Sequence, residues 1–304
     1  MWATRTPLRL PSSSGGQMSS PALVAIVGPT ASGKSALAMK VAQMYGGEII
    51  CADSRTVYKG MDIGTAKPSV RERALVPHHL LDIVRPHEPF TAADFKAAAT
   101  KAIAAIHSRG HVPVLVGGTG LYIDSVLFDF EFGEPADPQR RTELQQMTIE
   151  ALQDICRQNN IEIPINDQNK RHLIRAIELG GLPKNNRDIR PYTLVVGIST
   201  DREVLRQRIE HRARAMLQAG ITDEVRGLAN EYGWEPEAMT GNIYRIFRGV
   251  IEGVKSEQEA LQEVVTSDMQ LAKRQMTWFR RNPHIVWGEP DELLERVGRF
   301  LHSS

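Results

Sequence analysis

The sequence predicts an α/β protein with a parallel, doubly wound sheet, and two observations carry this prediction. Short apolar, β-branched runs at residues 23–27 and 112–116 are typical of strands that are buried on both faces of a sheet. Each run is followed by a glycine-rich turn and then by a helix-forming stretch. Strands that alternate with helices favour parallel pairing. We therefore expect one α/β core built from residues 21–128 and 191–304.

The elements of this core follow one another in order along the chain. Apolar runs of strand length occur at 23–27, 48–52, 80–84, 112–116 and 192–198. The first helix is expected to end before the glycines at 46–47, and a capping box at Thr91–Asp94 begins a helix that stops at Gly110. A further helix starts at Leu121, and Asp201 caps a long helix with apolar positions at helical spacing.

Two segments lie outside this pattern. Residues 129–190 contain amphipathic helical stretches, including 141–159 and 170–178, and no convincing strand, so we expect a helical insertion domain. Residues 1–20 are rich in Ser, Gly and Pro, which predicts a disordered tail. That tail lacks the apolar core of a secretory signal.

The composition excludes several classes of protein. The chain has 304 residues, of which 41% are hydrophobic, and its apolar runs are too short to span a membrane. Its two cysteines cannot form a disulfide scaffold or a zinc cage. We expect a cytoplasmic, monomeric globular protein. The net charge is +1, but residues 170–214 hold eleven basic and five acidic residues, which suggests either a polyanionic partner or a solvated basic helix face.

One motif carries specific chemistry. The eight residues after the first predicted strand fit G-x-x-x-x-G-K-[ST], the P-loop, without a mismatch. In such a loop the backbone amides and the following helix N-terminus bind phosphate oxygens, the lysine neutralises their charge, and the last hydroxyl is a ligand for Mg²⁺. The predicted phosphate site therefore consists of Gly28, Pro29, Thr30, Ala31, Ser32, Gly33, Lys34 and Ser35, with Ser35 as the metal ligand.

A P-loop does not by itself identify the reaction. Asp53 follows the second predicted strand, at the sheet edge where α/β folds bind ligands, and is either a catalytic carboxylate or a turn residue. Leu80–Asp82 is a weak candidate for the strand and aspartate that P-loop motors and switches use for their metal. We interpret His78 and His79 as structural, since adjacent side chains diverge and no third ligand is suitably spaced. A small-molecule transferase is the best interpretation at this stage.

The neighbouring motifs extend this interpretation. The segments at 53–68, 76–83, 92–95, 116–122, 208–217 and 270–280 resemble, in order, those of the tRNA dimethylallyltransferases, also called tRNA isopentenyltransferases. The similarity runs from about Leu23 to Arg281, nearly the whole chain. Six motifs in the family's order are far more specific than the P-loop alone.

The resemblance implies a fold, a reaction and a set of site residues. The fold is a P-loop NTPase-like sheet with a helical insertion, and the reaction transfers the dimethylallyl group of dimethylallyl diphosphate to N6 of adenine 37 in tRNA. The P-loop then binds the diphosphate of the prenyl donor together with Mg²⁺. Asp53 takes the position of the general base, and Thr119 and Arg212 take positions around the diphosphate and the reaction channel.

The resemblance also implies contacts with the tRNA anticodon loop. The positions concerned are Asp53, Ser54, Arg55, Thr56, Lys170, Arg171, His172, Arg175, Lys273, Arg274 and Arg280. For Trp278 we favour packing in the core over contact with RNA. The chain departs from the family's usual residues at Arg55, Thr56 and His172, which leaves the choice of tRNA open.

Two alternative functions remain at this point. The first is a P-loop kinase acting on a small metabolite or nucleotide, which would need ATP and no RNA. The second is an RNA-binding protein that has lost catalysis, which the altered tRNA-contacting positions suggest. Substitution of Asp53 separates the latter from a working transferase, because only a catalyst has turnover to lose.

Overall fold

The computed structural model describes residues 22–133, 137–181 and 188–303, and it confirms the α/β class and the parallel sheet. Six strands lie in the order β3-β2-β4-β1-β5-β6, and every pair is parallel. They are β1 (Leu23–Val27), β2 (Gly47–Ala52), β3 (His78–His79), β4 (Val112–Gly117), β5 (Thr193–Ile198) and β6 (Ile285–Gly288). The predicted tail at 1–20 lies outside the described residues.

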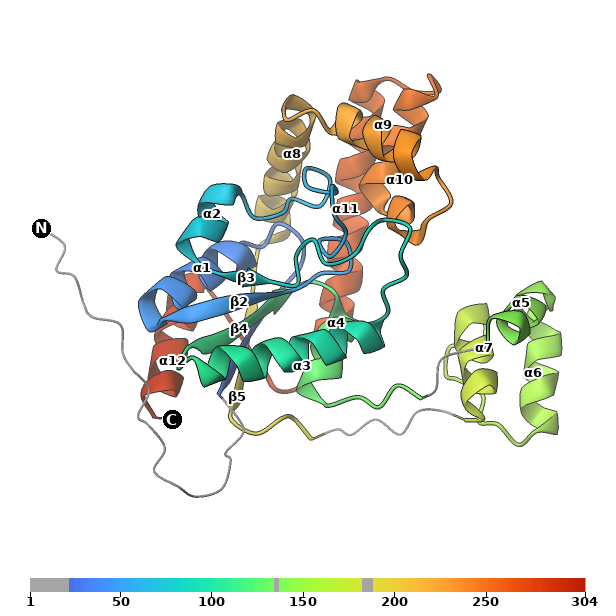
Figure 1. Cartoon of the computed structure of the whole chain (residues 1–304), viewed down its shortest axis with the longest axis horizontal. Helices are drawn as coiled ribbons and strands as arrows, with labels where there is room; N and C mark the ends of the chain where they lie inside the picture. Colours follow the sequence, from blue (N-terminus) through green and yellow to red (C-terminus); the bar gives the residue numbers. More distant parts are fainter. Residues whose placement is uncertain (1–21, 134–136, 182–187, 304) are drawn as a thin grey trace, which may run out of the picture. The chain divides into compact units, whose positions relative to one another are not determined.

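The sheet is covered by helices on both faces (Figure 1). Val24 and Ile26 pack with helices α1 (Lys34–Tyr45) and α12 (Pro290–His302) in one apolar cluster. The intervening residues of β1 are also fully buried, because α3 (Ala92–Ser108) and α4 (Gly120–Leu127) cover the other face. Burial on both faces explains why β1 reads as a continuous apolar run rather than an alternating one.

A helical bundle stands at the carboxyl ends of the strands. It contains α8 (Arg202–Gln218), α9 (Ile221–Tyr232), α10 (Asn242–Ile251) and α11 (Glu257–Phe279), and a short 3₁₀ turn η1 (Glu237–Thr240) precedes α10. Its core includes the buried Tyr244 and Phe247 of α10. The long connection between β2 and β3, which includes the short helix α2 (Val70–Leu75), packs against this core through Tyr58 and Met61.

Residues 128–188 cluster separately from the rest of the described chain. This second unit contains α5 (Pro138–Gln146), α6 (Ile149–Gln158) and α7 (Lys170–Leu179), and it has its own core around Leu144, Leu152 and Leu173. Its described residues form helices and loops.

Two predictions about elements are wrong, and one strand is not predicted. The run at 80–84 is not a strand, because Leu80 and Asp82 have positive φ values of 63° and 55°, and the strand lies two residues earlier at β3. The stretch 141–159 forms two helices rather than one, since Thr148 caps a new helix. β6 has no counterpart among the predicted strands.

No helix in the described ranges combines sufficient length with sufficient hydropathy to cross a bilayer.

Candidate active site

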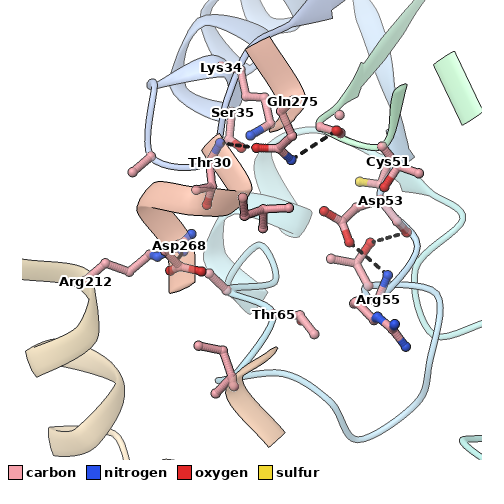
Figure 2. A pocket seen from close by; sticks show the side chains of 18 of the residues that line it. Thr30, Lys34, Ser35, Cys51, Asp53, Arg55, Thr65, Arg212, Asp268 and Gln275 are labelled. Atoms are coloured by element: carbon pink, nitrogen blue, oxygen red, sulfur yellow. Dashed lines mark hydrogen bonds and ion pairs between the residues drawn. The ribbon is translucent and has the colours of Figure 1, made fainter. Parts of the chain in front are cut away.

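A cavity of about 1020 Å³ lies at the carboxyl ends of the strands. Its walls come from the P-loop, from the segments that follow β2 and β4, and from α8, α10 and α11 (Figure 2). The volume is at the upper end of the range for small-molecule sites. The parallel sheet accounts for this convergence, because the loops after β1, β2 and β4 all leave the same edge.

The P-loop forms one wall of the cavity as a site for anions. Gly33 has a φ of 96°, which L-residues rarely adopt, and this allows the turn into α1. The N-terminus of α1 has no side-chain cap and no acidic residue in its first turn, unlike α2, α3 and α11, which all begin with capping boxes. Uncapped amides at a helix N-terminus carry partial positive charge and bind phosphate oxygens.

Two side chains of the P-loop complete this arrangement. The Lys34 ammonium donates to the carbonyl oxygen of Pro29 at 3.2 Å. Burial lowers the pKa of Lys34 to about 8, although Asp53 acts in the opposite direction. The buried hydroxyl of Ser32 has no hydrogen-bond partner within the described part of the chain. A lysine short of negative partners and an unsatisfied hydroxyl both fit a bound polyanion.

Asp53 and Thr119 lie on the two loops next to the P-loop. Asp53 directly follows β2, and its Oδ1 accepts a hydrogen bond from the backbone N–H of Arg55 at 2.8 Å. Thr119 Oγ1 accepts from the backbone N–H of Ser54 at 3.1 Å. Burial and the charge of Asp53 raise the pKa of the neighbouring Cys51 thiol to about 12, so this cysteine remains protonated and unreactive. The structure therefore brings Asp53, Thr119 and Lys34 to one cavity.

Arg212 also lines the cavity, but it does so as half of an ion pair. One guanidinium nitrogen lies 2.5 Å from Oδ2 of Asp268, a buried residue of α11. On the same helix α8, Arg208 donates to the carbonyl oxygen of Ser32 at 3.0 Å and thereby supports the P-loop. Sequence reasoning did not find Asp268 or Arg208, because an acidic residue or an arginine within a helix gives no signal of its own.

Five of the residues predicted to contact RNA line the same cavity. They are Asp53, Ser54, Arg55, Thr56 and Arg274. The Arg55 guanidinium donates to the carbonyl oxygen of Glu237 at 2.6 Å, so it holds η1 against the segment after β2. Thr56 is buried, and its hydroxyl donates to the carbonyl oxygen of Asp53 at 3.4 Å.

The exposed face of α11 carries further residues that are predicted to contact RNA. A groove of about 430 Å³ is lined there by Gln270, Lys273, Arg274, Thr277, Trp278 and Arg281. The prediction that Trp278 packs in the core is wrong: its side chain is 37% exposed, and its indole N–H donates to Oδ2 of Asp124 at 2.6 Å. Burial raises the pKa of Asp124 to about 6, and the indole hydrogen bond partly offsets that rise. Arg280 follows at the C-terminus of α11 and is exposed.

The remaining predicted contacts lie on α7 of the second unit. Arg171 and His172 are exposed, whereas Arg175 forms an ion pair with Glu178 at 3.4 Å. Lys170 donates to the carbonyl oxygen of Gln145 at 2.6 Å. The basic stretch 170–214 is therefore divided between the two units.

Comparison with known proteins identifies the family of this chain. The family model described as IPP transferase matches residues 56–282, three quarters of the chain. The chain belongs to the IPP transferase family. The match covers Thr119, Arg212 and α11, and the resemblance found in the sequence is thereby confirmed.

Relatives of this family member extend the match over nearly the whole chain. A tRNA dimethylallyltransferase from Geobacter metallireducens is 42% identical over 92% of this chain and 97% of its own length, and one from Desulforudis audaxviator is 42% identical over 91% and 95%. The crystal structure of the tRNA isopentenylpyrophosphate transferase from Bacillus halodurans superposes with a TM-score of 0.71 at 35% identity, covering 93% of this chain and 97% of that one.

A more distant structure shares the fold. A eukaryotic dimethylallyltransferase acting on tRNA superposes with a TM-score of 0.76 at 23% identity, over 89% of this chain and 74% of that one. The P-loop NTPase-like architecture that the sequence predicts is therefore confirmed.

Proposed function

We propose that this protein transfers the dimethylallyl group from dimethylallyl diphosphate to N6 of adenine 37 in tRNA and releases diphosphate. The observation that carries the proposal is the placement of a phosphate-binding loop and a carboxylate, Asp53, on one cavity of about 1020 Å³. Such a cavity has room for a small diphosphate and an extruded adenine. The names of the relatives, which are tRNA dimethylallyltransferases, support the same reaction.

The P-loop would act on the leaving group. As the allylic C–O bond breaks, negative charge gathers on the diphosphate, and the backbone amides at the start of α1 and the Lys34 ammonium stabilise it. Arg208 holds the backbone of Ser32 in place, so these donors are preorganised before the substrate binds. Thr119 and the Arg212–Asp268 pair would complete the wall around the reaction channel.

Asp53 would act on the nucleophile. The N6 amine forms the new bond to the allylic carbon while the C–O bond breaks, and one N6 proton passes to the Asp53 carboxylate. The Arg55 N–H holds Oδ1 of Asp53, which fixes the carboxylate without neutralising it. The products are the prenylated adenine, diphosphate and a proton.

Mg²⁺ is the proposed cofactor, and the residues present fit it. Ser35 is exposed on the cavity at the start of α1, where its hydroxyl can serve as a ligand. The described residues contain no group of three or more His, Cys, Asp or Glu side chains placed to hold a metal. Such a donor set suits an ion that uses few protein oxygens and takes the rest from phosphate and water. When bound, Mg²⁺ would neutralise charge on the departing diphosphate.

RNA would reach the cavity through an unpaired loop. Adenine 37 has to leave its stack to enter the cavity, as enzymes that modify bases require. The basic residues on α11 (Lys273, Arg274 and Arg280) and on α7 (Lys170, Arg171, His172 and Arg175) are the proposed phosphate contacts, together with Ser54, Arg55 and Thr56 at the cavity. We further propose that the protein acts as a cytoplasmic monomer.

The test is transfer of label from labelled dimethylallyl diphosphate, with Mg²⁺, to an anticodon stem-loop that carries either A37 or G37. We expect label in the A37 substrate alone and no consumption of ATP. ATP turnover on a small acceptor without label in RNA would identify the P-loop kinase instead. RNA binding without any turnover would identify an RNA-binding protein that has lost catalysis.

A substitution at Asp53 tests the assigned chemistry. Asp53→Asn keeps the oxygen that accepts from Arg55 but removes the proton acceptor, so kcat should fall by roughly 10²- to 10⁴-fold. The affinity for the A37 stem-loop should remain within about twofold, because shape and phosphate contacts are unchanged. Asp291→Asn, at a position 91% exposed on α12, is the matched control and should leave kcat unchanged. An equal loss in both variants would contradict the role of Asp53.

A further inference from the structure

Gln275 of α11 bridges two loops of the cavity that lie far apart in the sequence. Its Oε1 accepts a hydrogen bond from the backbone N–H of Thr30 at 2.8 Å, and its Nε2 donates to the carbonyl oxygen of Gly118 at 3.0 Å (Figure 2). These two partners fix the orientation of the amide, because a backbone N–H can only donate and a carbonyl can only accept. One side chain therefore joins the P-loop to the loop that follows β4.

The loop after β4 is shaped to receive α11 at close range. A Cβ at Gly118 would lie 2.3 Å from Nε2 of Gln275, and a Cβ at Gly120 would lie 2.3 Å from Cδ1 of Trp278. Gln275 and Trp278 are three residues apart and share one side of the helix. Together they hold the loop on both sides of Thr119.

The connection continues to Asp53. Thr119 Oγ1 accepts from the backbone N–H of Ser54 at 3.1 Å, and the N–H of Thr119 donates to the carbonyl oxygen of Ala52 at 3.3 Å. Asp53 lies between Ala52 and Ser54 in the chain. A chain of hydrogen bonds thus runs from the P-loop through Gln275 and Thr119 to the segment that carries Asp53.

We propose that Gln275 is a positioning residue that sets the spacing between the phosphate-binding loop and the loops that carry Thr119 and Asp53. This inference rests on the proposed prenyl transfer. In that reaction the leaving oxygen and the attacking nitrogen lie on opposite sides of one carbon, so the group that binds the diphosphate and the base must keep a fixed separation. Gln275 supplies that separation through the two loops, without a role in proton transfer.

The test compares two substitutions by single-turnover transfer of label to the A37 stem-loop. Gln275→Met has a similar length but makes neither hydrogen bond, and we expect its rate of chemistry to fall about 10- to 100-fold. Its KM for RNA should stay within about twofold of the wild-type value, since the exposed face of α11 is unchanged. Gln262→Met, at an exposed glutamine on the same helix, is the matched control and should behave as the wild type.

Gln275→Glu gives a readout that a structural role would not produce. The ionised carboxylate can accept from Thr30 but cannot donate to Gly118, whereas the protonated acid can do both. Its rate relative to the wild type should therefore recover as the pH falls from 8 to 5.5, and pH effects that both proteins share cancel in this ratio. The Glu variant also carries the test if the Met variant does not fold.

The outcomes separate this inference from the proposed function. If the wild-type protein transfers label and Gln275→Met retains at least half of its rate, the bridging role is wrong and the proposed function stands. A rate for Gln275→Glu that is low but independent of pH relative to the wild type would also overturn it. If the wild-type protein transfers no label, the proposed function fails, and this inference fails with it.

Discussion

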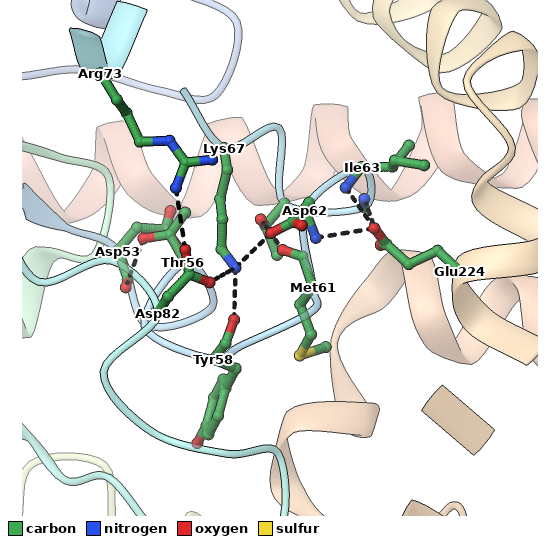
Figure 3. Close-up of polar contacts among 12 residues, drawn as sticks. Asp53, Thr56, Tyr58, Met61, Asp62, Ile63, Lys67, Arg73, Asp82 and Glu224 are labelled. Atoms are coloured by element: carbon green, nitrogen blue, oxygen red, sulfur yellow. Dashed lines mark hydrogen bonds and ion pairs between the residues drawn. The ribbon is translucent and has the colours of Figure 1, made fainter. Parts of the chain in front are cut away.

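Two lysines near the cavity, Lys34 and Lys67, have opposite surroundings. The side chain of Lys67 is 1% exposed, and its ammonium is saturated by Asp62 at 2.8 Å, Asp82 at 2.5 Å and the carbonyl oxygen of Tyr58 at 2.6 Å (Figure 3). Lys34 donates to one carbonyl oxygen at 3.2 Å, and it forms no ion pair within the described ranges. Lys67 has the partners of a structural cation, whereas Lys34 has room for a ligand.

The regions around them differ in the same way. Around Lys67, Asp82 also binds Arg73 at 3.2 Å, and Glu224 of α9 accepts from the backbone N–H groups of Asp62 and Ile63 (Figure 3). These contacts fix the long connection between β2 and β3. Around Lys34, the helix terminus is uncapped and the Ser32 hydroxyl is unsatisfied in the described chain. The difference indicates that saturated polar groups stabilise this fold, and unsaturated ones mark its site.

Removing each lysine should separate these roles, and we expect the largest effects here. Lys34→Met should lower kcat/KM for the prenyl donor by roughly 10²- to 10³-fold, because it removes the cation that we propose stabilises the leaving group. Its Tm should not fall, since burial of a cation with few partners costs stability. Lys67→Met should lower the free energy of unfolding by about 1–3 kcal/mol, because it leaves Asp62 without its cation and Asp82 with Arg73 alone.

Urea unfolding and steady-state kinetics of the two variants check this contrast. Lys40→Met, on the exposed face of α1, is the control for loss of a lysine and should change neither quantity by much. A Lys34 variant that lost stability while it retained transfer would reverse the assignment.

Glu48 lies near the start of β2, at the opposite end of the strand from Asp53, and it is another charged group with saturating partners. Burial alone would raise the pKa of Glu48, but hydrogen bonds from Arg109, His79 and His111 lower it from 4.5 to about 2. A carboxylate with a depressed pKa stabilises the folded state above its unfolded value of 4.5 and loses that contribution as the pH falls toward 2. This contribution should be about 2–3 kcal/mol.

Urea unfolding of the wild type and of Glu48→Gln between pH 7 and pH 3 measures this effect. The wild type should be the more stable protein at pH 7, and the difference should shrink as the pH falls below about 4.5. Glu295→Gln, which removes an exposed carboxylate from α12, is the control. A difference that is constant with pH would show that Glu48 does not act through its charge.

Much of the core could be predicted because local sequence controls it. The run at β1, the P-loop and the capping box before α3 each combine a local pattern with one backbone outcome. The run at 80–84 was predicted to be a strand, but its apolar side chains lie in a loop that contains left-handed residues. The contact that holds Asp82 in this loop comes from Lys67, which lies 15 residues away and gives no local signal. β6 was missed because it is four residues long and lies at the sheet edge, where only Ile285 is buried.

The site residues divide in the same way, into those that local sequence identifies and those that depend on distant partners. Lys34 and Ser35 are identified by their motif, and Asp53 by its place after a strand. Gln275 and Asp268 could not be assigned from local sequence, because their partners on the P-loop and on α8 lie 245 and 56 residues away. Trp278 was misassigned since an aromatic residue at helical spacing usually packs in a core, and here the glycine at 120 lets it lie against a loop instead.

The smallest effect concerns the protonation of Lys34. With a pKa of about 8, the protonated fraction falls about threefold between pH 7.5 and pH 8.5. Since the ammonium form is the one proposed to bind the diphosphate, kcat/KM for the prenyl donor should fall by that factor over this range, whereas kcat should fall less, because a bound diphosphate would raise the pKa of Lys34. Lys34→Arg remains charged at every pH used and should abolish this part of the decline. A profile that is the same in the wild type and in Lys34→Arg would assign the decline to another group, and the contrast between Lys34 and Lys67 would then not extend to the protonation of Lys34 in this pH range.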